Sequence, residues 1–106
     1  MREASVEARL RKMIERAGGK CLKWTCPGHT GVPDRIILMP GGRIYFAELK
    51  APGEKERARQ EYVQERLRKL GFKVFSSVDS FERALDVVAE LLRDQREEKQ
   101  DGVDSD

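Results

Sequence analysis

Residues 31–50 read GVPDRIILMPGGRIYFAELK, and this stretch predicts two short β-strands joined by a tight turn. Side chains alternate between the two faces of a strand, so Asp34 shares one face of the first strand with Ile36. The PGG sequence at 40–42 supplies glycines that tolerate positive φ in a tight connection. The second strand is predicted from about residue 43 to residue 50. The stretch therefore predicts an antiparallel hairpin at the centre of the fold.

The hairpin is predicted to bring two carboxylates together. Glu48 and Lys50 point to the same side of the second strand, while Leu49 faces the opposite core. Antiparallel pairing across the turn brings Asp34 close to Glu48. Two carboxylates about 4–5 Å apart repel by roughly 3–4 kcal/mol at an effective dielectric near 20. A fold keeps such a pair if the two groups share a proton or if a divalent cation lies between them.

Magnesium suits such a pair because it prefers carboxylate and carbonyl oxygens and keeps several waters, which makes it a usual partner of phosphate substrates. The ammonium of Lys50 would then hold a water beside a scissile phosphate. The alternative is a surface Glu–Lys pair at strand spacing, which is common and contributes little. The ELK triplet alone favours this alternative, but Asp34 on the neighbouring strand shifts the balance towards a metal-dependent hydrolase.

Two motifs, PD at 33–34 and ELK at 48–50, together resemble the signature of the PD-(D/E)XK nucleases. The wider context resembles the virus-type replication-repair nuclease (VRR-NUC) family. The residues that carry this resemblance are GGKCLKW at 18–24, GVPDRIILMPGGRIYFAELKAPG at 31–53, and Gln60. The resemblance covers roughly residues 3–80. A bare PD…ExK pattern is weak, but its combination with Gly31, the PGG turn and the downstream glutamine is specific.

The resemblance implies a restriction-endonuclease-like core and a deoxyribonuclease that uses Mg²⁺ or Mn²⁺. Asp34, Glu48 and the main-chain carbonyl of Leu49 would bind the metal. Lys50 would position the attacking water with the assistance of Gln60, and in-line attack would leave 5′-phosphate and 3′-hydroxyl ends. The resemblance to stand-alone members of the family also implies a homodimer that acts on branched DNA. A Holliday junction or a flap is therefore the first substrate prediction, in replication, repair or recombination.

Residues 2–17 predict an amphipathic helix with an apolar stripe that includes Leu10 and Ile14, ended by the glycines at 18 and 19. Glu7 lies at the edge of this stripe. An acid in that place is often an ion-paired surface residue. Because Glu7 also falls where the resembling family carries an acidic residue, the second interpretation makes it a further metal ligand, acting through water.

A second helix is predicted over residues 55–70, with core positions at Tyr62, Val63, Leu67 and Leu70. Gln60 stands twelve residues after Glu48. It is either a solvent-facing helix residue or, as the resemblance implies, a neighbour of the catalytic lysine. The same helix carries basic residues that could contact a phosphate backbone, namely Lys55, Arg57, Arg59, Arg66, Arg68 and Lys69.

The remaining elements complete the order α-β-β-β-α-β-α, a small α/β domain whose mixed sheet is flanked by helices. Strands are predicted over residues 20–25 and 72–77. The loop at 26–32 is expected to border the active site. A final helix is predicted to start with an N-cap at Asp79 or Ser80 and to end near residue 95. Its apolar stripe comprises Phe81, Ala84, Leu85, Val88, Leu91 and Leu92.

Composition indicates one domain, over residues 1–94, followed by a disordered acidic tail at 95–106. The chain has 106 residues and a net charge of +2. From Asp94 onward six acids face two bases, a charge of −4, which leaves +6 on residues 1–93. A basic folded part is typical of proteins that bind phosphate groups, although a densely charged solvated surface produces a similar pattern.

No apolar run is long enough to cross a bilayer, and no signal-peptide pattern is present, so the sequence predicts a soluble protein of the cytoplasm of a bacterium or phage-infected cell. Two cysteines, Cys21 and Cys26, are too few for a disulfide framework. With His29 they form no recognisable zinc spacing, so reduced thiols are expected. No catalytic role is assigned to His29.

Two other functional classes stay open at this point. The chain could be a non-catalytic DNA-binding module, although the intact Asp34, Glu48 and Lys50 argue against this. It could also be an interaction subunit of a larger replication-repair complex, with an apolar surface around Phe72, Phe75 and Phe81. For a homodimer, the predicted interface is the strand at 72–77 and the final helix.

Overall fold

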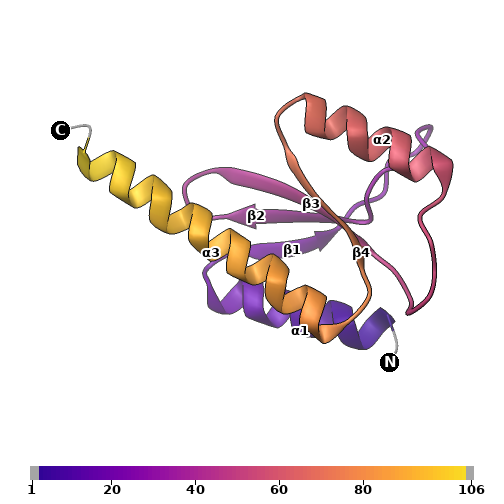
Figure 1. The fold of residues 1–106 in the computed structure, drawn as a ribbon, viewed down its shortest axis with the longest axis horizontal. Coiled ribbons are helices and arrows are strands. Elements are labelled where there is room, and N and C mark those ends of the chain that lie inside the picture. The colour runs from indigo at the N-terminus through magenta and orange to yellow at the C-terminus, as the bar shows by residue number, and fades with distance from the viewer. Residues whose placement is uncertain (1–2, 105–106) are drawn as a thin grey trace.

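A computed structural model describes residues 3–104 of the chain, with side chains described as far as residue 98 (Figure 1). The elements follow the predicted order: α1 (Glu3–Arg16), β1 (Lys20–Lys23), β2 (Arg35–Met39), β3 (Arg43–Leu49), α2 (Ala58–Lys69), β4 (Lys73–Val78) and α3 (Phe81–Asp104). None of the helices within residues 3–104 is long and apolar enough to span a membrane. The mixed α/β fold class predicted from the sequence is confirmed.

The four strands form one sheet in the order β1-β2-β3-β4. The first three strands are antiparallel to one another, and β4 lies parallel to β3. The predicted hairpin is present, because β2 pairs with β3 around a turn in which Gly41 and Gly42 adopt φ values of +88° and +76°. A parallel neighbour needs a long crossover, and α2 provides it between β3 and β4.

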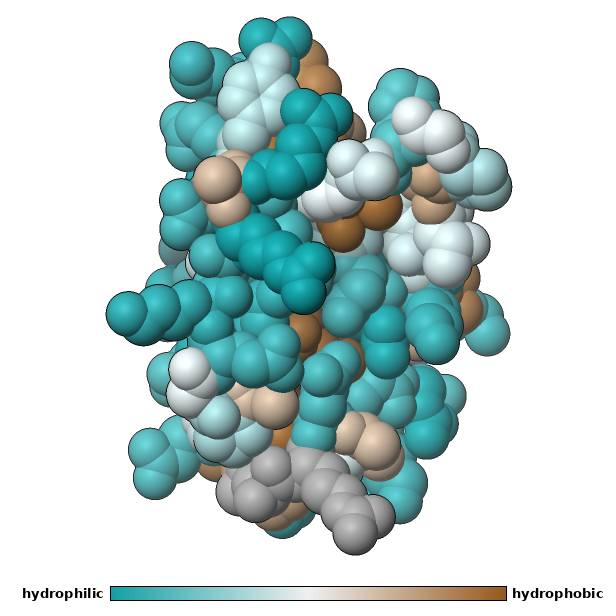
Figure 2. Space-filling model, turned by 90° about the vertical axis from the view of Figure 1, so that its right-hand side faces the viewer, coloured by the Kyte–Doolittle hydropathy of each residue, from teal (hydrophilic) through white to brown (hydrophobic). Residues whose placement is uncertain are grey.

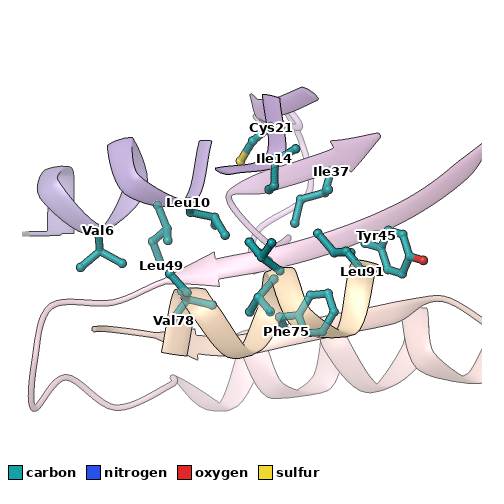
Figure 3. Close-up of a cluster of buried hydrophobic side chains, with 14 of the residues drawn as sticks. Val6, Leu10, Ile14, Cys21, Ile37, Tyr45, Leu49, Phe75, Val78 and Leu91 are labelled. Atoms are coloured by element: carbon teal, nitrogen blue, oxygen red, sulfur yellow. The ribbon is translucent and has the colours of Figure 1, made fainter. Parts of the chain in front are cut away.

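The main core lies between the sheet and the pair α1 and α3, which cover the same face (Figure 1). Figure 3 shows buried side chains of α1, the sheet and α3 directed towards one another, among them Leu10, Ile37, Leu49 and Leu91. Leu49 therefore faces the core, as the alternation in the second strand predicts. Burial of these side chains fixes the position of β3, and β3 carries the residues of the candidate site.

The second helix differs from its prediction. Val63 and Leu67 are only half-buried, Tyr62 is 55% exposed and Leu70 is 75% exposed. The buried residue of α2 is instead Gln64. The physical reason is that α2 packs mainly on β4 at one edge of the sheet, so a narrow stripe suffices to hold it. The prediction that Tyr62 and Leu70 are core residues of this helix is therefore wrong.

The third helix continues to Asp104, whereas the sequence predicts its end near residue 95 and a disordered tail over 95–106. The helix crosses the predicted boundary at residue 94 without interruption. Side chains at its distal part hold it against the hairpin: Arg43 pairs with Glu98 at 3.0 Å, and the hydroxyl of Tyr45 donates to Asp94 at 2.9 Å. These contacts come from tertiary structure and have no local signal. Residues 105 and 106 lie outside the described residues.

Candidate active site

The candidate site lies at the end of the sheet where β2 begins and β3 ends. Asp34 directly precedes β2, Glu48 lies in β3, and Lys50 follows it. The backbone N–H of Asp34 donates to Glu48 Oε2 at 3.1 Å, and the backbone N–H of Leu49 donates to Asp34 Oδ1 at 3.1 Å. The structure thus brings Asp34 and Glu48 together, because each carboxylate accepts a hydrogen bond from the other strand.

Gln60, in the first turn of α2, joins Lys50 to Glu48. Lys50 Nζ donates to Gln60 Oε1 at 2.8 Å, and Gln60 Nε2 donates to Glu48 Oε1 at 3.0 Å. The backbone N–H of Arg57 also donates to Gln60 Oε1, which fixes the amide at the start of the helix. Glu48 and Lys50 are buried, with 5% and 6% of their surfaces exposed. Gln60 therefore does not face solvent freely but orients the two buried charged groups.

Burial makes the charged form of both carboxylates unfavourable. Burial, with the negative charges of Asp34 and Glu56, raises the pKa of Glu48 to about 7 against the opposing effect of Lys50. Burial also raises the pKa of Asp34, although the Leu49 N–H and the charge of Arg35 act in the opposite direction. Both shifts mean that the site holds its full negative charge poorly, and a cation between the carboxylates would relieve this.

The donor set of the site fits a hard divalent cation. Asp34 uses Oδ1 to accept the hydrogen bond from the Leu49 N–H, so its second oxygen is available as a ligand beside Glu48. No group of three or more His, Cys, Asp or Glu side chains that could hold a metal is found among the described residues. The candidate site has two carboxylates instead, and Mg²⁺ commonly completes so small a set with waters. The Leu49 carbonyl stays a predicted ligand.

Glu7 is held by arginines. It pairs with Arg11 at 3.5 Å in α1 and lies 3.9 Å from Nε of Arg35. Arg35 in turn approaches Asp34, with Nη1 3.8 Å from Oδ1 and donating to the Asp34 carbonyl at 2.9 Å. Arg35 thus links Glu7 to Asp34, and a role of Glu7 at the metal stays a prediction.

The structure adds two residues to the site that the sequence did not predict, Arg35 and Glu56. Strand alternation places Arg35 on the face opposite Asp34, so its long side chain gave no signal of the contact. Glu56 lies in the charged segment EKER at 54–57, where nothing distinguishes it from solvated neighbours. In the structure its Oε2 lies 3.8 Å from Lys50 Nζ.

The loop at 26–32 packs against the start of α2, beside the site. Arg59 Nε donates to the carbonyl of Thr30 at 3.3 Å. Gly31 has φ +85°, and a Cβ there would lie 2.8 Å from Arg59, so only glycine fits this approach. His29 is exposed on this loop. The loop therefore contacts α2 at the residue next to Gln60, and its place at the border of an active site stays a prediction.

Figure 2 shows the end of the molecule where β2 begins and β3 ends, and its surface is mostly hydrophilic. The exposed side chains near the start of α2 include Lys55, Arg57 and Arg59. Arg59 also lies over the ring of Tyr62, with its guanidinium carbon 5.3 Å from the centroid. Cations at this position could contact phosphate groups of a bound nucleic acid.

Comparisons with known proteins find chains similar to this one. No protein-family model matches the sequence. The chain is 43% identical over 74 residues to "Putative nuclease p44" of Acyrthosiphon pisum secondary endosymbiont phage 1, a match that covers 70% of this chain and 80% of the phage protein. A solved structure described as "VRR_NUC domain" superimposes with a TM-score of 0.75 at 31% identity, over 82% of this chain and 94% of that one. The chain therefore belongs to the VRR-NUC family of the PD-(D/E)XK nuclease superfamily.

Proposed function

We propose that this protein is a Mg²⁺- or Mn²⁺-dependent deoxyribonuclease that hydrolyses phosphodiester bonds. One observation carries the proposal: Asp34, Glu48, Lys50 and the neutral amide of Gln60 form a single hydrogen-bonded network of buried and half-buried polar groups at one end of the sheet. The raised pKa of Glu48 supports it, because a buried carboxylate whose charged form is unfavourable is a candidate ligand for a cation.

In this proposal Asp34, Glu48 and the Leu49 carbonyl bind the metal, and Glu7 contributes through water. The bound cation would supply a Lewis acid for the scissile phosphate. Lys50 donates one N–H to Gln60 and keeps two for other acceptors, so it can hold the attacking water in line with the leaving oxygen. Gln60 keeps the lysine directed at the site. In-line attack would leave 5′-phosphate and 3′-hydroxyl ends.

The proposed substrate is branched DNA, a Holliday junction or a flap, in replication, repair or recombination. A junction resolvase must cut two strands symmetrically, which requires two active sites related by a two-fold axis. We propose a homodimer for this reason. Phe75 and Val78 of β4 are packed in the core. An interface at the predicted strand and the final helix would therefore use the apolar side chains that are exposed there: Phe72 just before β4, and Leu85 and Leu92 on α3.

A cleavage panel tests the nuclease proposal. Linear duplex, flap and four-way junction DNA, with an RNA duplex as a further arm, are incubated with Mg²⁺, Mn²⁺ or EDTA. We expect cleavage of branched DNA that requires the cation and stops in EDTA. Cleavage that persists in EDTA would remove the metal from the proposal. Binding without cleavage under every condition would favour a non-catalytic DNA-binding protein or an interaction subunit of a larger complex.

A mixing experiment tests the dimer. Wild-type protein is mixed with an excess of Lys50→Ala protein, so that most wild-type subunits are in heterodimers. These should nick one strand of a four-way junction without completing resolution. Full resolution in proportion to the wild-type protein added, with monomers in sedimentation, would exclude the resolvase reading and leave a nuclease that makes single cuts.

A further inference from the structure

Glu56 is a buried carboxylate beside the candidate site, and its two oxygens have different surroundings. Oε1 accepts the backbone N–H of Ser77 at 2.9 Å and the Ser77 hydroxyl at 3.2 Å. Oε2 is buried, has no hydrogen-bond partner among the described residues, and lies 3.8 Å from Lys50 Nζ. Only 9% of the side chain is exposed. A buried charge of this kind is unfavourable unless a neighbouring charge compensates it, and Lys50 is that neighbour.

Ser77, the anchor of Glu56, lies in an irregularity of the sheet. Ala47 pairs with Phe75 and Leu49 with Val78, so β4 has one residue more than β3 over this interval. Ser77 is the one non-glycine residue with positive φ in the described part of the chain, at +54°. At this extra residue the Ser77 N–H donates to Glu56. The next residue of β4, Val78, accepts the Lys50 N–H at its carbonyl oxygen at 3.1 Å. The irregularity thus connects the Glu56 side chain to the backbone of Lys50.

The charges around Lys50 explain why its ammonium needs Glu56 as a second negative neighbour besides Glu48. Lys50 Nζ is 3.9 Å from Glu48 and 3.8 Å from Glu56, and it donates to the neutral Gln60. If Glu48 binds a divalent cation, its negative charge is largely shared with that cation. The cation would also repel the nearby ammonium. Glu56 would then be the remaining full counter-charge of Lys50.

We propose that Glu56 is a positioning residue for Lys50: anchored on Ser77, it holds the ammonium in place beside the metal-binding carboxylates. The inference rests on the proposed nuclease function and deepens it. Glu56 acts through Lys50 and does not touch the substrate. Gln60 fixes the ammonium from α2, and Glu56 fixes it from the segment that precedes this helix, so two separate groups restrain one catalytic side chain.

The first test is Glu56→Gln, which removes the charge but keeps an amide oxygen for Ser77. We expect single-turnover cleavage to fall between about tenfold and a hundredfold, because small displacements of a catalytic group have effects of this size. The dissociation constant for DNA in Ca²⁺ or EDTA should change less than about twofold. Glu54→Gln is the matched control, since Glu54 is an exposed carboxylate in the same segment that, among the described residues, accepts only the Ala51 N–H. It should cleave like the wild type.

The second test is an unfolding cycle that needs no activity. Urea unfolding in EDTA is compared for the wild type, Glu56→Gln, Lys50→Gln and the double variant. If the two charges interact, each single substitution leaves a buried charge unpaired, and the double variant loses less than the sum of the two losses. Ser77→Ala, which deletes the hydroxyl contact but keeps the N–H contact, should leave the coupling unchanged.

The outcomes separate the two proposals. Wild-type cleavage by Glu56→Gln, or additive losses in the unfolding cycle, would overturn the role of Glu56. Coupled losses together with reduced cleavage by Glu56→Gln would support it. If no protein in the set cleaves DNA, the nuclease function fails, and with it the catalytic role of Glu56, while coupled losses would still establish its hold on Lys50.

Discussion

The two faces of the sheet are packed in different ways. On the face covered by α1 and α3, the buried side chains are almost entirely apolar, and they include Leu10, Ile14 and Leu91 with no exposed surface. On the other face, the buried residues include Phe46 but also the charged Glu48, and α2 itself contributes Gln64 and no fully buried apolar side chain. Burial of apolar area stabilises the first face, whereas the second holds charged and amide groups whose burial is unfavourable in itself.

The comparison shows where stability and chemistry reside in this domain. β3 belongs to both faces, since Tyr45, Ala47 and Leu49 point into the core and Phe46 and Glu48 point to the other side. The apolar contacts of one face therefore hold the polar groups of the other in position. Substitutions on the two faces should have separable effects, on stability for the first and on cleavage for the second.

The largest effect is expected from Glu48→Gln. The substitution removes a ligand charge while keeping the side-chain shape, and a metal ligand contributes several kcal/mol to transition-state stabilisation, so cleavage should fall by about 10³-fold or more. Far-UV circular dichroism should be unchanged, and DNA binding in EDTA should persist. The measurement is single-turnover cleavage in Mg²⁺. Activity close to that of the wild type would remove Glu48 from the mechanism.

Leu10→Ala, on the apolar face, should lower the stability of the fold and leave the cleavage rate nearly unchanged. Leu10 is fully buried, and truncation of a buried leucine lowers the free energy of unfolding by about 2–5 kcal/mol. Urea unfolding gives the loss. Under conditions where the variant remains folded, its cleavage rate per folded molecule should stay within a few-fold of the wild type. A large loss of cleavage by folded Leu10→Ala protein would show that the two faces are not separable.

The pH dependence of stability should report on the polar face. Because burial raises the pKa of Glu48 from its usual value near 4.5 to about 7, the folded state holds this proton more tightly than the unfolded state. The associated stability is complete below about pH 4.5 and is lost as pH rises through about 7, by on the order of 3 kcal/mol. Unfolding in EDTA at pH 5 and pH 8 measures the loss.

Two controls sharpen this measurement. Glu48→Gln has no proton to lose at this position, so its stability should change less between pH 5 and pH 8 than that of the wild type. Mg²⁺ at pH 8 should restore stability to the wild type, because a ligand that binds only the folded state stabilises it. Equal pH dependence in both proteins would mean that Glu48 does not titrate in this range.

The smallest effect is expected at the distal end of α3. A chain truncated after Arg96 loses the Arg43–Glu98 ion pair, in which the Glu98 side chain is half exposed, and such pairs contribute less than about 1 kcal/mol. The melting temperature should fall by no more than about 8 °C. Glu98→Ala in the full chain should reproduce most of the shift. Loss of mainly acidic residues should also tighten non-specific DNA binding slightly at low salt.

The sequence by itself determined the order of the elements and the hairpin at the centre of the site. Strand alternation and the PGG turn predict the hairpin, and they place Asp34 beside Glu48 with Leu49 facing the core. These features are local, because a two-residue period and a short connection fix which side chains meet across a hairpin. The position of Gln60 beside the lysine was implied by resemblance to a family and not by any local pattern.

Only the tertiary structure decided the surroundings of that centre. The sequence gives no sign that Glu56 is buried against Lys50, because this depends on the extra residue of β4 at Ser77, far along the chain. Likewise, α2 rests on one edge of the sheet, so Gln64 is buried where Tyr62 and Leu70 were expected. The distal part of α3 remains helical where contacts with Arg43 and Tyr45 hold it. In each case the deciding contact joins residues that the local pattern cannot relate.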